Sequence, residues 1–94
     1  MPVTRLNEFH AAPDKGAELR AFLQSIISMI EDAPGCVSVT LLANTDDPTR
    51  FAIVEEWHSV EAHQASAQRI PPEKIAEVRT FLAEAPKGGY YEAI

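Results

Sequence analysis

Apolar and polar residues alternate most clearly over residues 51–57, and this pattern predicts a β-strand. Side chains two residues apart along a strand lie on the same face, so Glu55 and Trp57 are expected to share the face that carries Ile53. The only tryptophan of the chain is thereby placed beside an acid. The chain then turns into a predicted helix with Ser59 as its N-cap. We therefore expect this strand–helix junction to be the functional site.

A second pattern, in which apolar residues recur three and four positions apart, predicts a long helix. It opens at residues 13–16, which contain a proline and a glycine, and ends at Pro34-Gly35. Its apolar stripe is interpreted as core. The stripe consists of Leu19, Phe22, Leu23, Ile26, Ile27 and Ile30.

The remaining elements complete a familiar order. Strands are predicted over residues 3–10, 36–43 and 90–94, a polar hairpin loop over 44–49, and helices over 60–68 and from Pro72 through an apolar face that includes Ile75, Val78, Phe81 and Leu82. The order β-α-β-β-α-(α)-β is that of the split, ferredoxin-like α+β fold, with helices on one face of a four-stranded antiparallel sheet. Residues 1–94 are expected to form one domain.

The second face of this sheet also carries apolar groups and has no helix to cover it. A chain of 94 residues buries only a modest fraction of its surface and is often helped by oligomerisation. The same face of a second copy is the simplest cover, so we expect a homodimer with two-fold symmetry.

Charge and composition narrow the possible partners. The formal net charge is −6 and the eight lysines and arginines are scattered, which argues against nucleic acid and against an anionic membrane surface. No apolar run approaches the roughly 20 residues of a membrane span, and the N-terminus lacks a secretion signal. The one cysteine, Cys36, forms no internal disulfide, and no Cys/His cluster has metal-site spacing. A cytoplasmic protein without a bound metal is expected.

Several short motifs together resemble the antibiotic biosynthesis monooxygenase family of dimeric α+β barrels. The central one is Glu55-x-Trp57 with a small polar cap and then Glu61-Ala62. The other motifs are Asn7-Glu8-Phe9, Pro13 with Gly16, Leu19 with Phe22, Pro34-Gly35-Cys36-Val37, Asp47-Pro48 and Gly89-Tyr90-Tyr91. The resemblance covers nearly the whole chain and implies a dimer whose pockets lie between sheet and helices.

Members of this family differ in what they do, so the departures matter. The resemblance implies that some members oxygenate aromatic phenols or quinols without metal or flavin, and that others degrade haem. Many members carry a histidine where this chain has Ser66, and the haem-degrading branch carries a tryptophan near that position. Because Ser66 supplies neither group, haem degradation is disfavoured, and His63 becomes the candidate to replace the histidine.

A cofactor-free oxygenase requires a base, donors for a developing oxyanion and a dry pocket. His63 could be the base, Trp57 could stack on the aromatic ring and donate its N–H, and Asn7 could hold a substrate oxygen. These three residues are the catalytic candidates. The candidates for substrate binding are Tyr90, Tyr91, Ser66 and Phe9.

Each candidate also has a purely structural interpretation. Trp57 could be core, Glu55 a paired or strand-edge acid, His63 a half-exposed histidine, and Asn7 a cap on the backbone. Three functions therefore stay open: a monooxygenase that uses dioxygen and a small aromatic phenol or quinol, a non-catalytic dimeric binding module for an apolar metabolite, and a pure assembly domain. An enclosed cavity lined by Trp57, His63 and Asn7 would favour the first two.

Overall fold

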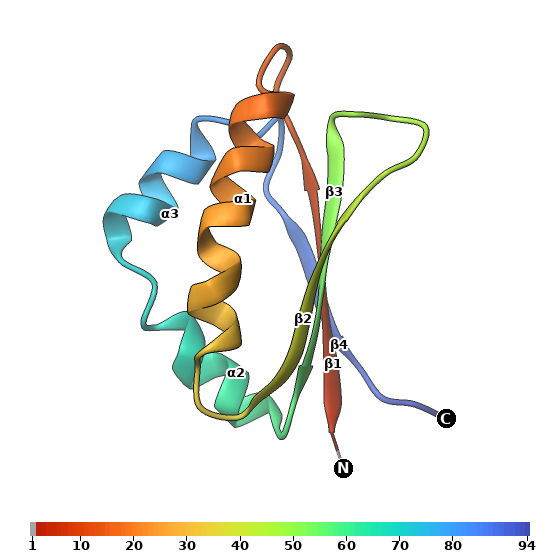
Figure 1. Ribbon diagram of the computed structural model, residues 1–94, viewed down its shortest axis with the longest axis vertical. Coiled ribbons are helices and arrows are strands. Elements are labelled where there is room, and N and C mark those ends of the chain that lie inside the picture. The colour runs from red at the N-terminus through yellow and green to blue at the C-terminus, as the bar shows by residue number, and fades with distance from the viewer. Residues whose placement is uncertain (1) are drawn as a thin grey trace.

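The computed structural model describes residues 2–94 and forms two layers, with helices on one face of a four-stranded sheet (Figure 1). The bare face of the sheet is the one turned away from the helices in Figure 1. The elements in chain order are β1 (Val3–His10), α1 (Gly16–Glu31), β2 (Cys36–Ala43), β3 (Arg50–Trp57), α2 (Val60–Ala67), α3 (Pro72–Arg79) and β4 (Lys87–Tyr91). This order and layering confirm the predicted ferredoxin-like α+β fold.

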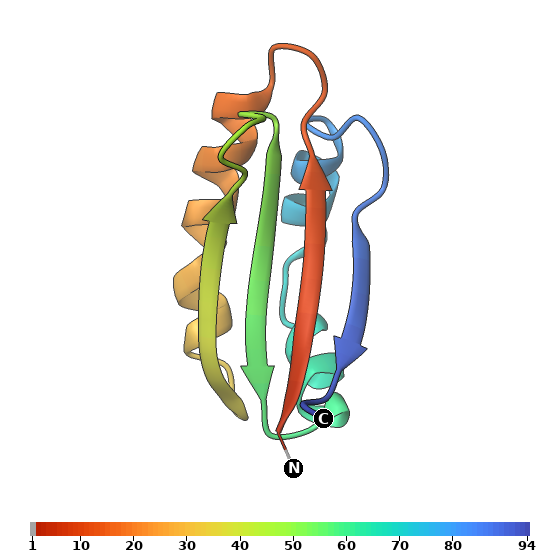
Figure 2. The same cartoon turned by 90° about the vertical axis from the view of Figure 1, so that its right-hand side faces the viewer.

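All strand pairs are antiparallel and the sheet order is β2-β3-β1-β4 (Figure 2). The two central strands are paired so that Arg5 lies opposite Glu55 and Asn7 opposite Ile53. On the other side of β1, Arg5 pairs with Tyr90 and Asn7 with Gly88. Since paired residues lie on the same face, β1, β3 and β4 place these groups together on the helix-covered side.

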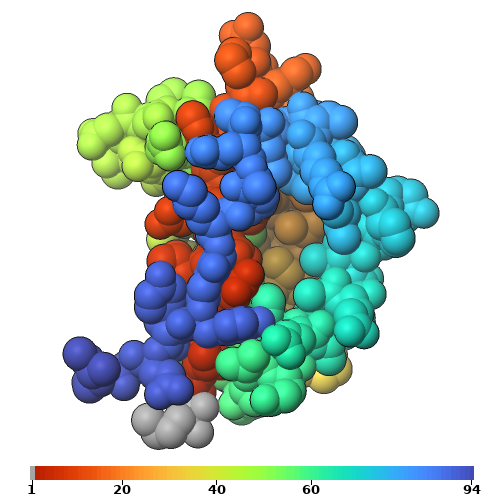
Figure 3. Space-filling model, turned by 180° about the vertical axis from the view of Figure 1, so that it is seen from behind, coloured from red at the N-terminus to blue at the C-terminus, as the bar shows by residue number. Residues whose placement is uncertain are grey.

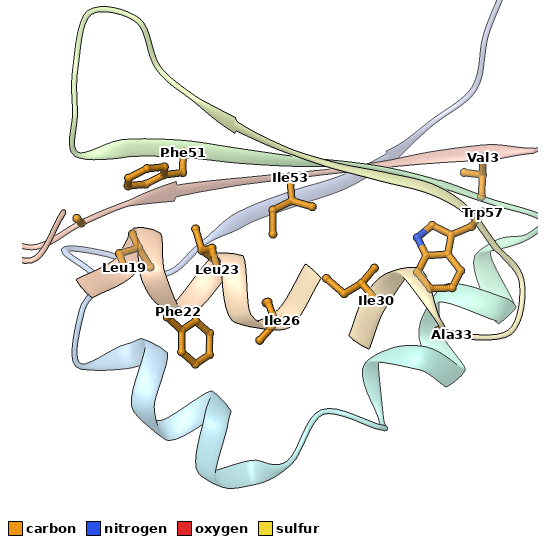
Figure 4. Packing of buried hydrophobic residues seen from close by; sticks show 11 residues of the cluster. Val3, Leu19, Phe22, Leu23, Ile26, Ile30, Ala33, Phe51, Ile53 and Trp57 are labelled. Atoms are coloured by element: carbon orange, nitrogen blue, oxygen red, sulfur yellow. The ribbon is translucent and has the colours of Figure 1, made fainter. Parts of the chain in front are cut away.

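The core lies between this side of the sheet and α1 (Figure 4). The predicted stripe of α1 faces it, with Leu19 and Leu23 fully buried, whereas Ile27 is only partly buried. Ile53 and Trp57 extend from β3 into the same layer, as the alternation predicted. Burial of these aliphatic and aromatic groups is the main favourable contribution to folding, at roughly 25 cal/mol per Å² of apolar surface.

Two local features fix the turns around the predicted junction. Ser59 caps α2 as expected, because its hydroxyl accepts a hydrogen bond of 3.1 Å from the backbone N–H of Ala62. Gly35 ends the turn after α1 with a φ of +87°, a conformation that favours glycine. A Cβ at Gly35 would also overlap the methyl group of Ala62, so the glycine lets α2 approach the start of β2.

Two predicted boundaries were wrong near the C-terminus. The last strand spans Lys87–Tyr91 instead of residues 90–94, because Gly88 and Gly89 pair with β1 instead of only ending a helix. The helix α3 ends at Arg79, so Phe81 and Leu82 follow it, and Leu82 forms an isolated β-bridge with Ala11. A glycine pair usually signals a turn, but here Gly88 lies in the strand and leaves room for side chains that extend from β1.

The bare face of the sheet carries the second apolar surface that the alternation predicted. Leu6, Ala52 and Val54 are half-buried on it. No helix lies over this face of the sheet (Figure 2). Leu42 and Tyr91 lie on the same face and are 46% and 57% exposed. Residues 2–94 thus leave one face of the sheet uncovered.

Candidate active site

A cavity of about 410 Å³ lies between the sheet and the three helices. Figure 3 shows it from behind, as a hollow between β4 and the two short helices α2 and α3, with atoms of α1 visible inside. Its volume falls in the range of about 300–1,000 Å³ that is usual for ligand pockets. Its apolar wall consists mainly of Phe9, Phe22, Leu23, Ile26, Ile30, Ile53, Ile70, Ile75 and Val78.

Glu55 places a buried carboxyl group in this mostly apolar wall. The residue is only 3% exposed, because the alternation that buries Ile53 and Trp57 also buries Glu55. The indole N–H of Trp57 donates a hydrogen bond of 2.8 Å to its Oε1. Burial raises the pKa of Glu55 above 4.5, and the Trp57 hydrogen bond and the charge of Arg5 partly oppose this increase. Glu55 therefore holds a proton more readily than a carboxyl group in water.

His63 reaches the same carboxyl group from α2. Its Nε2 lies 3.9 Å from Oε1 of Glu55, and its Nδ1 shares a hydrogen bond of 2.5 Å with the hydroxyl of Tyr90. The imidazole also packs edge-on against Trp57, with ring centroids 5.4 Å apart. Burial, and then the charge of Arg5, lower the pKa of His63 below 6.5. The imidazole is therefore neutral at pH 7 and can accept a proton.

Arg5 brings a positive charge into the same wall. Its guanidinium carbon lies 4.7 Å from the ring centroid of Tyr90, a cation–π contact. Its Nε is buried and has no hydrogen-bond partner. A buried polar atom without a partner is rare and calls for an explanation. Arg5 thus brings a buried donor without a protein partner to the cavity.

Asn7 lies two residues after Arg5 on the same face of β1, and both side chains pass over Gly88 of β4. A Cβ at Gly88 would overlap both Oδ1 of Asn7 and the guanidinium of Arg5. The glycine therefore creates the space in which these two polar groups reach the cavity. A signal for it existed in the sequence, since a glycine inside a strand often marks a close approach.

The structure brings most of the predicted site residues together, but in different roles. Asn7, Phe9, His63 and Ser66 line the cavity. Tyr90 lies behind His63, to which it is hydrogen-bonded.

Like Tyr90, the two remaining candidates lie outside the cavity wall. Trp57 is fully buried and its N–H is bound to Glu55, so the indole is not placed to stack on a ligand as we expected. Trp57 acts on the cavity only through its hydrogen bond to the carboxyl group of Glu55, which lines the cavity. Tyr91 follows Tyr90 on the strand and therefore points to the bare face.

Sequence reasoning missed Arg5 altogether, and it placed Glu55 in the predicted junction without naming it as a catalytic or binding residue. The alternation did place Glu55 on the face of Trp57, and it placed Arg5 on the face of Asn7, which was the available signal. A charged residue on the buried side of a strand is uncommon, and this alone could have marked both residues.

The described part of the chain has neither a candidate metal site nor a membrane-spanning helix. Within residues 2–94, no three side chains of the His, Cys, Asp or Glu type gather closely enough to hold a metal ion. No helix in that range has the length and apolar character needed to cross a bilayer.

Several solved structures share this fold over almost their whole length and over almost the whole of this chain. Rv0793 from Mycobacterium tuberculosis aligns with a TM-score of 0.86 at 23% identity, over 100% of this chain and 96% of that one. PA3566 from Pseudomonas aeruginosa aligns at 0.85 and 19%, over 99% and 94%. A variant of SnoaB, a cofactor-independent oxygenase from Streptomyces nogalater, aligns at 0.81 and 20%, over 98% and 92%. These likenesses establish the ferredoxin-like fold class.

The sequence profile of one family matches most of the chain, over residues 2–77. The protein belongs to the antibiotic biosynthesis monooxygenase family, as the motifs around Trp57 indicated. No curated protein sequence matches the chain significantly.

The raised pKa of Glu55 predicts how the free energy of unfolding depends on pH. The folded protein binds the Glu55 proton more tightly than the unfolded chain, so this group's contribution to stability falls as pH rises from about 4.5, its unfolded value, through its folded pKa. Glu55→Gln has no charge to bury and still offers an oxygen to Trp57. We expect it to gain stability relative to the wild type as pH rises from 4 to 8, measured by urea unfolding.

Glu56→Gln is the matched control. Glu56 is the next residue on β3, points to the bare face and accepts a hydrogen bond from Thr4. Its stability difference from the wild type should not follow the same rise with pH. If Glu55→Gln were destabilised increasingly toward pH 8, the buried carboxyl group would be a net stabilising ion and our account of its pKa would be wrong.

Proposed function

We propose that this protein is a homodimeric, cytoplasmic monooxygenase that oxidises a small aromatic phenol or quinol without metal or flavin, with His63 as the base. The observation that carries the proposal is the position of the His63 imidazole, held between Glu55 and Tyr90 in the wall of an apolar cavity. Membership of the family and the fold shared with SnoaB, a cofactor-independent oxygenase, support it.

The reaction balances when the substrate supplies all the electrons. A naphthol with a free para position reacts with one dioxygen to give the para-quinone and one water. His63 takes the hydroxyl proton, and the electron-rich phenolate gives one electron to dioxygen. The resulting radicals join at the para carbon and form a C–O bond. Loss of the para C–H proton and cleavage of the O–O bond then release water and leave the second carbonyl group.

His63 is suited to the first proton transfer. In the proposed state Nδ1–H donates its hydrogen bond to the Tyr90 oxygen, so Nε2 carries the free lone pair. The imidazolium that forms lies 3.9 Å from Oε1 of Glu55, and an ionised Glu55 stabilises it. Trp57 fixes the orientation of that carboxyl group through its N–H.

The apolar wall serves the later steps. A cavity surrounded mainly by aliphatic and aromatic side chains accepts a flat hydrocarbon ring system and excludes water from reactive intermediates. Asn7 offers an amide that can bind the second oxygen of a quinol. Phe9 and Ser66 line the cavity and would contact the ring system.

The bare sheet face supports the homodimer. Leu42 and Tyr91 are exposed on it beside half-buried aliphatic residues, and another copy of the same face would bury them together.

Oxygen uptake tests the catalytic proposal. A panel of naphthols, naphthalene diols and larger hydroxylated aromatics should include a substrate that consumes one dioxygen for each quinone formed, without hydrogen peroxide. We expect His63→Ala to lower kcat/KM by about 10²–10⁴-fold, the usual contribution of a general base. His58→Ala is the control, because His58 is exposed and lies outside the cavity wall.

The pH profile adds a second readout. Because burial and Arg5 lower the pKa of His63, the base form persists below pH 6.5. Activity should therefore decline only as pH falls through this lowered value. An acid limb above pH 6.5, or equal rates for wild type and His63→Ala, would show that His63 is not the base. Ligand binding without turnover for the whole panel would instead indicate the alternative function, a non-catalytic binding module.

The dimer is tested by Val54→Glu, which puts a charge on β3, one of the two central strands, at the bare face. We expect the wild type to have twice the chain mass in light scattering and the variant to shift to one chain mass while keeping its circular dichroism spectrum. Ala17→Glu introduces the same charge at the exposed start of α1 and should stay dimeric. A wild type with the mass of a single chain would contradict the proposed dimer.

A further inference from the structure

The net charge of the cavity wall is opposite in sign to the net charge of the whole protein. The chain has a formal net charge of −6, yet its cavity is lined by two cations, Arg5 and Lys74, and by one carboxyl group, Glu55. The fourth titratable group, His63, is neutral at pH 7 because its pKa is lowered. The residues that α1 contributes to the wall are all apolar. An excess of positive charge in an acidic protein favours an anionic ligand at this place.

Arg5 is the cation with free binding capacity next to the proposed base. Its Nε is buried without a partner, and among residues 2–94 the ion pairs of the structure leave Arg5 without a carboxylate within 4 Å. Its contact with the Tyr90 ring uses the positive charge, not an N–H hydrogen bond. Lys74, in contrast, lies 5.7 Å from the centroid of the Phe22 ring, on the helix side of the cavity.

We propose that Arg5 is a catalytic residue that binds the phenolate oxygen of the substrate, so that the cavity stabilises a bound phenol in its ionised form. The inference rests on the proposed function, since it concerns the same substrate oxygen that His63 deprotonates. A guanidinium presents its N–H groups in a rigid fork that suits an oxyanion. Arg5 also lies opposite Glu55 in the sheet register, which places it at the part of the cavity where His63 and Glu55 meet.

Desolvation of the phenolate opposes the effect of Arg5, and this competition makes the proposal testable. An apolar cavity by itself disfavours a charge and would raise the pKa of a bound phenol. Arg5 lowers the pKa of both neighbouring titratable groups, Glu55 and His63, and would act on a bound phenol in the same direction. The charge must outweigh the desolvation of the phenolate for the ionised ligand to be preferred.

The experiment uses 7-hydroxycoumarin, a bicyclic phenol whose ionised and neutral forms have different absorbance and fluorescence. We expect the wild type to bind the phenolate at least about 10-fold more tightly than the phenol, which equals a decrease of at least about one unit in the pKa of the bound ligand. Arg5→Met should abolish or reverse this preference. Arg5→Lys keeps the charge without the fork and should retain part of it.

Two controls separate charge recognition from cavity loss. 7-Methoxycoumarin cannot ionise, so its affinity should change less than about threefold between wild type and Arg5→Met. Arg20→Gln removes an exposed arginine outside the cavity wall and should leave the phenolate preference unchanged. If Arg5→Met does not fold, the wild type and Arg5→Lys decide the question.

The proposal is overturned if the wild type binds phenol and phenolate equally, if it prefers the phenol, if it binds neither coumarin, or if Arg5→Met keeps the full phenolate preference. These outcomes need no turnover. Failure of the oxygenase proposal would instead appear as ligand binding with the predicted preference but without oxygen uptake.

Discussion

The burial of one carboxyl group, that of Glu55, is the constraint on which the candidate site depends. A strand that alternates apolar and polar residues normally points its acids to solvent, but β3 places Glu55 between Ile53 and Trp57 on the covered face. An ionised carboxylate there is costly unless other groups compensate it. The compensation comes from the Trp57 N–H and from the charge of Arg5, with His63 close by. The polar cluster of the cavity is therefore organised around this group.

This dependence explains why the fold places chemistry at one end of an otherwise apolar layer. Trp57 fills the core and holds Glu55, so a residue that is structural by its burial also orients a functional group. Gly88 keeps β4 free of a side chain where Arg5 and Asn7 pass over it. The helix α2, brought close by Gly35, adds His63. Four elements, β1, β3, β4 and α2, thus contribute to one cluster.

The sequence predicted the framework better than the site. Periodicity placed the first strand, the long helix and the face of Trp57 correctly, because burial along one element follows from local spacing. It failed at Gly88, where a local breaker signal competed with strand pairing to a distant segment. It also assigned Trp57 to ligand stacking, because spacing cannot show that the indole N–H is already bound to Glu55, two residues earlier. The contact between His63 and Tyr90 spans 27 positions and arises only when α2 and β4 pack together.

The central claim is that His63 is a neutral base whose Nε2 is free. Nitrogen-15 NMR of the imidazole of His63 tests this most directly, because the chemical shifts of the two ring nitrogens report which one carries the proton. The account predicts, at pH 7, a neutral ring with its proton on Nδ1, which donates to Tyr90. A doubly protonated ring at pH 7, or a neutral ring with its proton on Nε2, would contradict it.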